Sequence, residues 1–251
     1  GGAMLLAFGP SLGILVGAAI YLPLTLWLVR APFGHAYRNE SRSAPRDGVA
    51  GILATARAIA GNRVVVAMTL LAGASSFFIG NAYQAQMPEF AADLGHGEAD
   101  VHYSMLLAAN AFGALSAGVI LESRGILQAN PKIAFILVIL WCFCMGGFAI
   151  SDNYLLSLAL MVAAGFLNLA FGAMSQTLVQ LYAPSAIRGR VIGLYGTSVN
   201  GMRAFSGMTV GMGGSLVGIH WSLGLSAVAL LVFTAGLLVF DLRARPPAPA
   251  Q

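Results

Sequence analysis

The sequence has 251 residues, of which 58% are hydrophobic and only 9% are charged. Soluble domains carry about 25% charged residues, so this composition excludes a water-soluble globule. The net charge of +4 is spread singly over polar segments and forms no basic stripe, which argues against nucleic acid as a partner. Several apolar runs reach the roughly 20 residues that cross a hydrocarbon core. The sequence therefore predicts an all-α polytopic membrane protein.

The first part of the chain predicts one complete span and a polar segment. Residues 1–8 are apolar, and we interpret them as the end of a preceding transmembrane helix. Gly9 and Pro10 predict a turn, and residues 11–29 predict the first complete span. Residues 30–62 are rich in arginine, and apolar residues recur in them at helical spacing between Val49 and Ile59. We expect a cytoplasmic linker that contains an interfacial amphipathic helix.

Six further spans are predicted between residues 63 and 240, and they form a C-terminal bundle. Pro88 closes the first of them, and short polar segments separate the others. The last is followed by a tail rich in Pro and Ala, residues 241–251. The predicted spans are residues 64–87, 101–121, 133–150, 154–182, 191–218 and 221–240.

The distribution of positive charge supports this span count. Every Lys and Arg except Arg203 falls on one set of alternating loops, and the other set holds only acidic, His and neutral residues. This alternation is the positive-inside rule satisfied at every crossing. It predicts a protein of the cell (inner) membrane with its C-terminus in the cytoplasm.

The clearest motif is a short basic segment between two long apolar runs, Leu-Tyr-Ala-Pro-Ser-Ala-Ile-Arg-Gly-Arg-Val-Ile-Gly-Leu-Tyr over residues 181–195. Pro184 lacks a backbone N–H and biases the residue before it away from the α region, so the preceding helix should end near Tyr182. Arg188 and Arg190 place fixed positive charge beside the next span. The segment therefore predicts a tight cytoplasmic loop.

This segment resembles the loop between the tenth and eleventh helices of major facilitator superfamily transporters. The likeness is closest to their bacterial exporter-like branch, the transmembrane secretion effectors. A second, weaker likeness is to the inside-loop motif of the same family, although its acid is Glu where Asp is usual. The first likeness rests on Pro184, Arg188, Gly189, Arg190, Val191, Gly193, Leu194 and Tyr195, and the second on Gly118, Glu122, Arg124 and Gly125.

The resemblance covers nearly the whole chain and implies that its spans are helices six to twelve. The segment 30–62 then looks like the linker between the two halves of a facilitator, each built of two inverted three-helix repeats. The chain begins Gly-Gly-Ala without an initiator Met. We therefore expect a fragment whose partner is the missing N-terminal half of the same transporter.

Amide and charged side chains occur deep in some spans and not in others. Residues 133–150 and 221–240 hold none, so these two spans can face lipid all round. The resemblance implies that the ninth and twelfth helices are peripheral and that the seventh, eighth, tenth and eleventh line a central cavity, which agrees with this distribution. Four such side chains lie roughly 15 to 20 Å from a span end at about 1.5 Å per residue, namely Asn110, Asn168, Asn200 and Arg203.

Alternatives stay open for each of these residues. A buried asparagine also bonds neighbouring helices without any ligand. A charged group near the bilayer centre costs several kcal/mol unless it faces water or a partner. Arg203 is therefore either a structural arginine or a cavity residue whose partner is an anionic substrate, a backbone carbonyl or a carboxylate of the missing half. Asn81 and Gln84, near the outer end of their span, are further cavity candidates.

The leading hypothesis for function is a secondary active transporter that exports a small molecule across the bacterial inner membrane by alternating access. Its expected partners are a small-molecule substrate, the lipid bilayer and the other half, with no cofactor and no metal. The alternative is a non-transporting membrane sensor, or a half-length subunit that assembles with another chain. We do not expect an enzyme, because the histidines fall in loops or at span ends, at His35, His96, His102 and His220.

Overall fold

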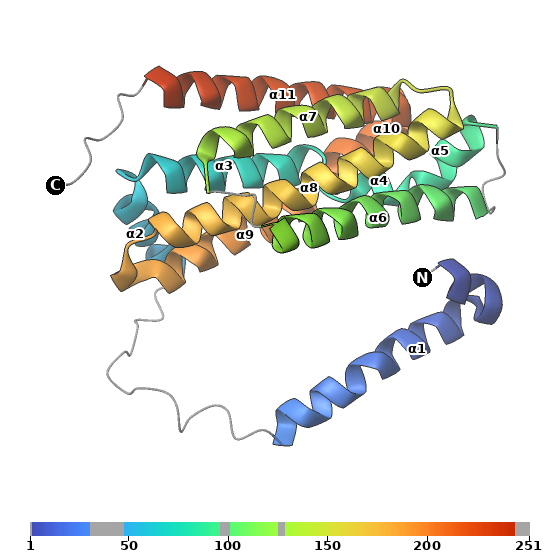
Figure 1. Ribbon diagram of the computed structural model, residues 1–251, viewed down its shortest axis with the longest axis horizontal. Helices are drawn as coiled ribbons and strands as arrows, with labels where there is room; N and C mark the ends of the chain where they lie inside the picture. Colours follow the sequence, from blue (N-terminus) through green and yellow to red (C-terminus); the bar gives the residue numbers. More distant parts are fainter. Residues whose placement is uncertain (1, 31–47, 96–100, 125–128, 244–251) are drawn as a thin grey trace. The chain divides into compact units, whose positions relative to one another are not determined.

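The structure is a computed structural model that describes residues 2–30, 48–95, 101–124 and 129–243. Every regular element within these ranges is a helix (Figure 1). The chain divides into two compact units, Gly1–Asp47 and Gly48–Gln251, which are treated separately. Residue 1, residues 31–47 of the predicted linker, residues 96–100, residues 125–128 with the motif residue Gly125, and the predicted tail from residue 244 lie outside the described residues.

The first unit contains one helix, α1 (Gly2–Arg30). The predicted turn at Gly9 and Pro10 is absent, because the helix continues through both residues. A proline in a helix removes one hydrogen bond and kinks the chain, but it need not end a helix that is apolar on both sides. Figure 1 shows a bend near the beginning of α1. Residues 2–8 are therefore part of the same helix as residues 11–29.

The second unit begins with α2 (Gly48–Ile59), which lies where the sequence predicted an amphipathic helix. It packs on helices α3 and α9 of the bundle through a face that includes Thr55 and Ile59, both of which are buried. Ile52 and Leu53 are about half exposed, at 49% and 51%. A helix with a packed face and exposed apolar residues suits the boundary between membrane and water.

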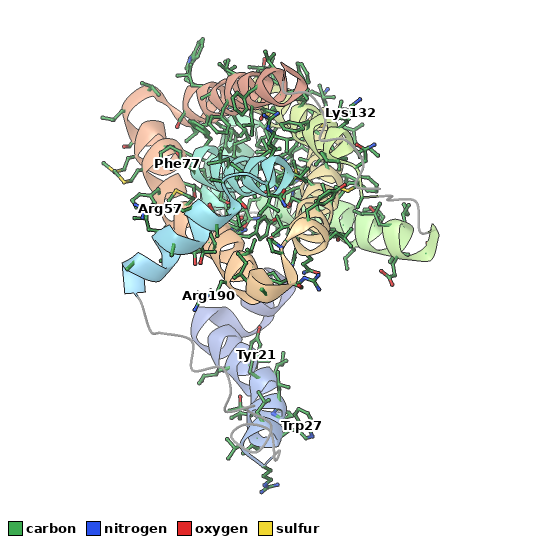
Figure 2. The ribbon with its side chains drawn as sticks, turned by 90° about the vertical axis from the view of Figure 1, so that its left-hand side faces the viewer. Tyr21, Trp27, Arg57, Phe77, Lys132 and Arg190 are labelled. Atoms are coloured by element: carbon green, nitrogen blue, oxygen red, sulfur yellow. The ribbon has the colours of Figure 1, made fainter. Side chains whose placement is uncertain are left out.

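The remainder of the second unit is a bundle of long helices, with α3 at its centre. Most residues of α3 are buried, and it contacts four other long helices of the bundle. Figure 2 shows side chains filling the space between the helices. Five described helices are long and apolar enough to cross a membrane, counting Arg63–Ala85 as one. The long helices are α3 (Arg63–Phe78), α6 (Val101–Arg124), α7 (Pro131–Ala149), α8 (Tyr154–Tyr182), α9 (Arg188–Ser206) and α11 (Ile219–Arg243).

The span predicted over residues 64–87 is interrupted in the structure. Helix α3 ends at Phe78, Gly80 adopts a φ of 51°, and two short helices follow, α4 (Ala82–Ala85) and α5 (Met87–Asp93). Pro88 does not close the span as predicted, because it lies in the first turn of α5. A proline is well tolerated there, since the first turn of a helix does not need its N–H group.

The span predicted over residues 191–218 is also irregular. Helix α9 is followed by a π-helix, η3 (Gly207–Met212), and by the short helix α10 (Gly213–Val217). A π-helix bonds to the fifth residue along the chain, and it interrupts the regular ladder of an α-helix. This stretch is not among the five described helices that are long and apolar enough to cross a membrane.

The other boundaries differ from the predictions by a few residues. Helix α8 begins and ends where the sequence predicted, at Tyr154 and Tyr182. Helix α6 continues beyond the predicted residue 121 to Arg124, so Glu122 and Arg124 lie on a helix and not in a loop. Helix α11 likewise runs to Arg243, past the predicted start of the tail at residue 241.

Asn62 joins the beginning of α3 to the end of α8, and its loss should destabilise the bundle. Its side-chain oxygen accepts a hydrogen bond from the Val65 N–H at 3.3 Å, and its amide donates to the Tyr182 carbonyl at 2.7 Å. We expect Asn62→Ala to lower the free energy of unfolding by about 1 to 2 kcal/mol, because it removes a helix cap and a tertiary hydrogen bond.

The variant Asn62→Ser separates these two contributions. Its hydroxyl keeps a cap acceptor and is too short to replace the bond to the Tyr182 carbonyl, so its loss should be about half as large. Denaturation of the purified variants in detergent measures both values. An Asn62→Ala protein as stable as the wild type would contradict the role of this residue.

Candidate functional site

A small polar cavity lies among four helices of the bundle. It measures about 80 Å³ and is lined from α3 and its C-terminal end, from α7, from α8 and from α9. Its described lining contains no carboxylate. The polar residues of the lining are Ser75, Ser76, Asn81, Trp141, Asn168, Tyr195 and Arg203, and its other residues are Ala72, Gly80, Phe171, Gly172 and Val199.

The structure brings three of the predicted cavity residues together here. Asn81 comes from the break after α3, Asn168 from α8 and Arg203 from α9. All three side chains are exposed in the described part of the chain. They lie far apart in the sequence, so only the packing of the helices places them at one cavity.

The other three candidates lie outside this cavity. Asn110 joins two elements of the bundle: its amide donates to the Met161 carbonyl of α8 at 3.4 Å, and its oxygen accepts from the Tyr83 hydroxyl at 3.5 Å. Asn200 donates to the Gly196 carbonyl of its own helix at 3.0 Å. Gln84 is half-buried on α4. The contacts of Asn110 are those of an asparagine that bonds neighbouring helices.

Arg203 has no acidic partner among the described residues. No carboxylate in that part of the chain lies within 4.0 Å of its guanidinium group. The polar groups that share its cavity are amides, hydroxyls and the Trp141 indole. A guanidinium group carries five N–H donors and cannot accept a hydrogen bond. The positive charge of Arg203 is therefore free to interact with an acceptor in the cavity.

Two of the polar cavity residues that sequence reasoning did not find are buried and lack a partner in the described part of the chain. Trp141 and Ser75 are only 1% and 5% exposed, and the Trp141 Nε1 and Ser75 Oγ atoms have no hydrogen-bond partner among the described residues. Buried polar atoms without a partner are rare. Trp141 lies in a span that the sequence assigned to the periphery, because an indole counts as apolar. The only signal was that a buried tryptophan N–H usually finds an acceptor.

The breaks in the two irregular spans meet beside this cavity. The Thr209 hydroxyl of η3 lies 2.8 Å from the Phe77 carbonyl and 3.3 Å from the Phe78 carbonyl, at the end of α3. It can therefore donate to either of these two oxygens, which the ending helix leaves without their usual partners. A side chain from the interrupted part of one span thus supplies a hydrogen bond to the interrupted end of the other.

The carbonyl groups of η3 find partners in side chains from neighbouring elements. The Ser222 hydroxyl of α11 lies 3.0 Å from the carbonyls of Thr209 and Val210, and the Gln86 amide donates to the Val210 carbonyl at 3.1 Å. These contacts compensate the interrupted ladder of the π-helix. Interrupted helices within a membrane are tolerated where they are buried in protein or line a cavity.

The basic motif forms the end of α8 and the beginning of α9. Ala183 is extended and ends α8, and Pro184 precedes a single turn of 3₁₀-helix, η2 (Ser185–Ile187). Arg188, Gly189 and Arg190 form the first turn of α9 and are exposed, so they lie on a helix and not in the predicted loop (Figure 2 labels Arg190).

Other motif residues have structural surroundings. The Tyr195 hydroxyl is hydrogen-bonded to the Ser175 hydroxyl at 2.6 Å, which joins α9 to α8. Gly118 and Glu122 lie on α6, and the Glu122 side chain is exposed.

A second, wider groove lies between α7 and α11. It measures about 720 Å³, and apart from Asp152 and His220 its lining is apolar. These are the two spans that the sequence assigned to the periphery, and apolar lining is what helices present to lipid. The polar chemistry of the bundle is thus concentrated in the smaller cavity.

Comparison with known proteins identifies the family. The family model of the Major Facilitator Superfamily matches residues 1–208, which is more than half of the chain. No curated protein and no solved structure is significantly similar to the sequence. The described helical fold, with five helices able to cross a membrane, agrees with the family match. The chain is a multi-pass membrane protein and belongs to the Major Facilitator Superfamily.

Proposed function

We propose that the protein is a secondary active transporter that exports a small molecule across the bacterial inner membrane by alternating access. Its family and its apolar helices make it a membrane transporter. The observation that carries the finer proposal is the convergence of Asn81, Asn168 and Arg203, from three elements, on one cavity. Ligand sites are concave and hold a few convergent polar groups, and mere packing of helices does not require such a group to carry a charge.

The exposure of Arg203 supports a cavity that a second bundle completes. Within the described residues, this face of α9 is uncovered at Asn200 and Arg203. An uncovered charge at membrane depth costs several kcal/mol in lipid, so water or protein must cover it. We propose that a second six-helix half supplies the opposite wall and that the two halves rock about the ligand.

The sequence motifs support the proposed direction of transport and the proposed orientation in the membrane. The resemblance of residues 181–195 to the exporter-like branch favours export. The exposed Arg188 and Arg190 at the start of α9 favour a cytoplasmic position for that end of the bundle, in keeping with the positive-inside rule. Two proposed crossings follow that end, over residues 191–218 and 221–240, and they favour a cytoplasmic position for the C-terminus as well.

Flux through proteoliposomes that contain the complete encoded protein tests this proposal. A panel of small anions and lipophilic compounds is offered under imposed proton and sodium gradients. We expect protein-dependent flux of at least one compound, and Arg203→Ala should lower anion flux about tenfold because a charge-assisted contact is lost.

Arg57→Ala is the matched control, because Arg57 is an exposed arginine on α2 that lies outside the cavity (Figure 2). Its flux should equal that of the wild type. If the folded protein moves no compound in either direction, the proposal of a transporter is wrong and the alternative of a membrane sensor is favoured. Equal flux in Arg203→Ala and wild type would show that Arg203 is structural.

A further inference from the structure

The polar lining of the cavity has an exposed and a buried part, which we call its mouth and its floor. Its mouth carries Asn81, Asn168 and Arg203, whose side chains are exposed. Its floor carries Ser75 and Trp141, whose side chains are buried. A ligand that enters from the mouth therefore meets the guanidinium group first and the buried indole and hydroxyl last.

Each of the two levels contains hydrogen-bond donors. A guanidinium group and an indole N–H can only donate, and a serine hydroxyl and an asparagine amide can also donate. The described lining contains no carboxylate that would accept these bonds. Trp141 and Ser75, whose Nε1 and Oγ atoms have no partner among the described residues, line the same cavity as Arg203. Such a cavity favours a ligand group that accepts hydrogen bonds, and the positive charge of Arg203 favours an anion among such groups.

The charge and size of the cavity narrow the class of anion. One arginine balances one negative charge, whereas a phosphate group carries about 1.5 to 2 at neutral pH. A volume of about 80 Å³ exceeds the roughly 10 to 15 Å³ that one buried water molecule needs, and it is smaller than the roughly 150 Å³ of a cavity that holds benzene. The cavity therefore accommodates a carboxylate-sized group, and the remainder of a ligand must extend through the mouth.

We propose that Trp141 and Ser75, together with Arg203, form a binding subsite for the carboxylate group of a small organic anion. This inference rests on the proposed transport cavity and adds the chemical class of its ligand. Arg203 supplies the charge and Trp141 and Ser75 supply directed hydrogen bonds from the floor. When the ligand is bound, the indole N–H donates a hydrogen bond to a carboxylate oxygen, so the buried donor gains an acceptor.

Binding of acetate to the purified complete protein tests the subsite directly. Acetate is the smallest probe with the required group, acetamide is its neutral counterpart of the same shape, and inorganic phosphate is the more highly charged anion. An NMR titration with ¹³C-labelled acetate yields the dissociation constant. We expect acetate to bind more tightly than phosphate and at least about tenfold more tightly than acetamide.

Substitution of the floor residues should weaken this binding. We expect Trp141→Phe and Ser75→Ala each to raise the dissociation constant for acetate about tenfold, because each removes a hydrogen bond to a charged group. Trp221→Phe is the control, because Trp221 is 71% exposed on α11 and lies outside this cavity. Its dissociation constant should match that of the wild type.

The indole resonance gives a second readout that does not depend on a folded Trp141→Phe protein. The ¹⁵N-indole signal of Trp141 should shift on addition of acetate and remain in place on addition of acetamide. Acetate binding without that shift, or equal binding of acetate and acetamide, would overturn the subsite.

Flux measurements on the same preparations separate this inference from the proposed function. Transport of other compounds without acetate binding would contradict the proposed subsite but not the proposed transport function. Acetate binding that depends on Trp141 and Ser75, without transport of any compound, would support the subsite and overturn the transporter.

Discussion

Replacing Gly165 with Ala should lower the free energy of unfolding by about 3 kcal/mol or more, because it forces α6 and α8 apart. A Cβ atom at Gly165 would overlap with the backbone oxygen of Asn110, and one at Gly113 would overlap with the backbone oxygen of Val162. These are backbone atoms, so no side-chain rotation relieves the overlap. Small residues at such positions let membrane helices approach closely, and α6 lies along α8 for much of its length (Figure 1).

Gly172→Ala is a matched control on the same helix. Residue 172 lies seven positions after Gly165, nearly on the same face of α8, and a Cβ atom there would meet nothing within 4 Å. We expect its stability to stay within about 0.5 kcal/mol of the wild type. Denaturation in detergent compares the two variants. Equal losses at the two positions would show that the close approach of α6 and α8 does not limit stability.

The fold could be predicted where local signals define the ends of a helix. Helix α8 was predicted from Tyr154 to Tyr182 because both of its ends are encoded nearby. Asn153 accepts hydrogen bonds from the N–H groups of Leu155 and Leu156 at its start, and Pro184 prevents its continuation. A polar cap residue and a proline can be recognised from the sequence alone, so the ends of this helix could be predicted without knowledge of the tertiary structure.

The breaks in the other spans could not be predicted in the same way. The run that contains Gly80 is apolar on both sides, and hydropathy does not distinguish a continuous helix from an interrupted one. The interruption is stabilised by residues more than 120 positions away, among them Thr209, whose hydroxyl reaches the end of α3. Contacts of that kind depend on how the helices pack, which the sequence pattern does not record.

The candidate site shows a similar division. Depth in the membrane predicted that Asn168 and Arg203 belong to a polar interior, and the structure places both at one cavity. Depth does not reveal which face of a helix a side chain occupies, so it also selected Asn110, whose amide bonds α8. Trp141 was not selected, because its single N–H group belongs to a large side chain that counts as apolar in a hydropathy pattern.

Gly80→Ala should have an effect as large as that of Gly165→Ala, and it should also disturb the cavity. Gly80 has a φ of 51°, which costs a residue with a Cβ atom about 1 to 2 kcal/mol. A Cβ atom there would lie 2.6 Å from the Ser76 carbonyl oxygen and 2.5 Å from Ser206 Oγ. Overpacking of this kind adds about 1 to 3 kcal/mol, so we expect a total loss of about 3 kcal/mol.

Gly95→Ala isolates the cost of the backbone conformation. Gly95 has a φ of 87°, and a Cβ atom there would meet nothing within 4 Å. Its loss of stability should therefore be limited to about 1 to 2 kcal/mol. A Gly80→Ala loss no larger than that of Gly95→Ala would show that the contact with Ser206 contributes nothing.

The contact with Ser206 links the break after α3 to the position of Arg203. The Ser206 hydroxyl donates to the Arg203 carbonyl at 2.7 Å, so a Cβ atom that displaces Ser206 also displaces the turn that carries Arg203. We therefore expect Gly80→Ala to weaken acetate binding, whereas Gly95→Ala leaves it unchanged. Ser206→Gly removes the atoms that a Cβ atom at residue 80 would contact. When it is combined with Gly80→Ala, it should restore part of the lost stability and part of the lost acetate binding. A double-mutant cycle measures the coupling between residues 80 and 206. Strictly additive losses would mean that residues 80 and 206 are not coupled. The position of Arg203 in the cavity would then not depend on the residue at position 80.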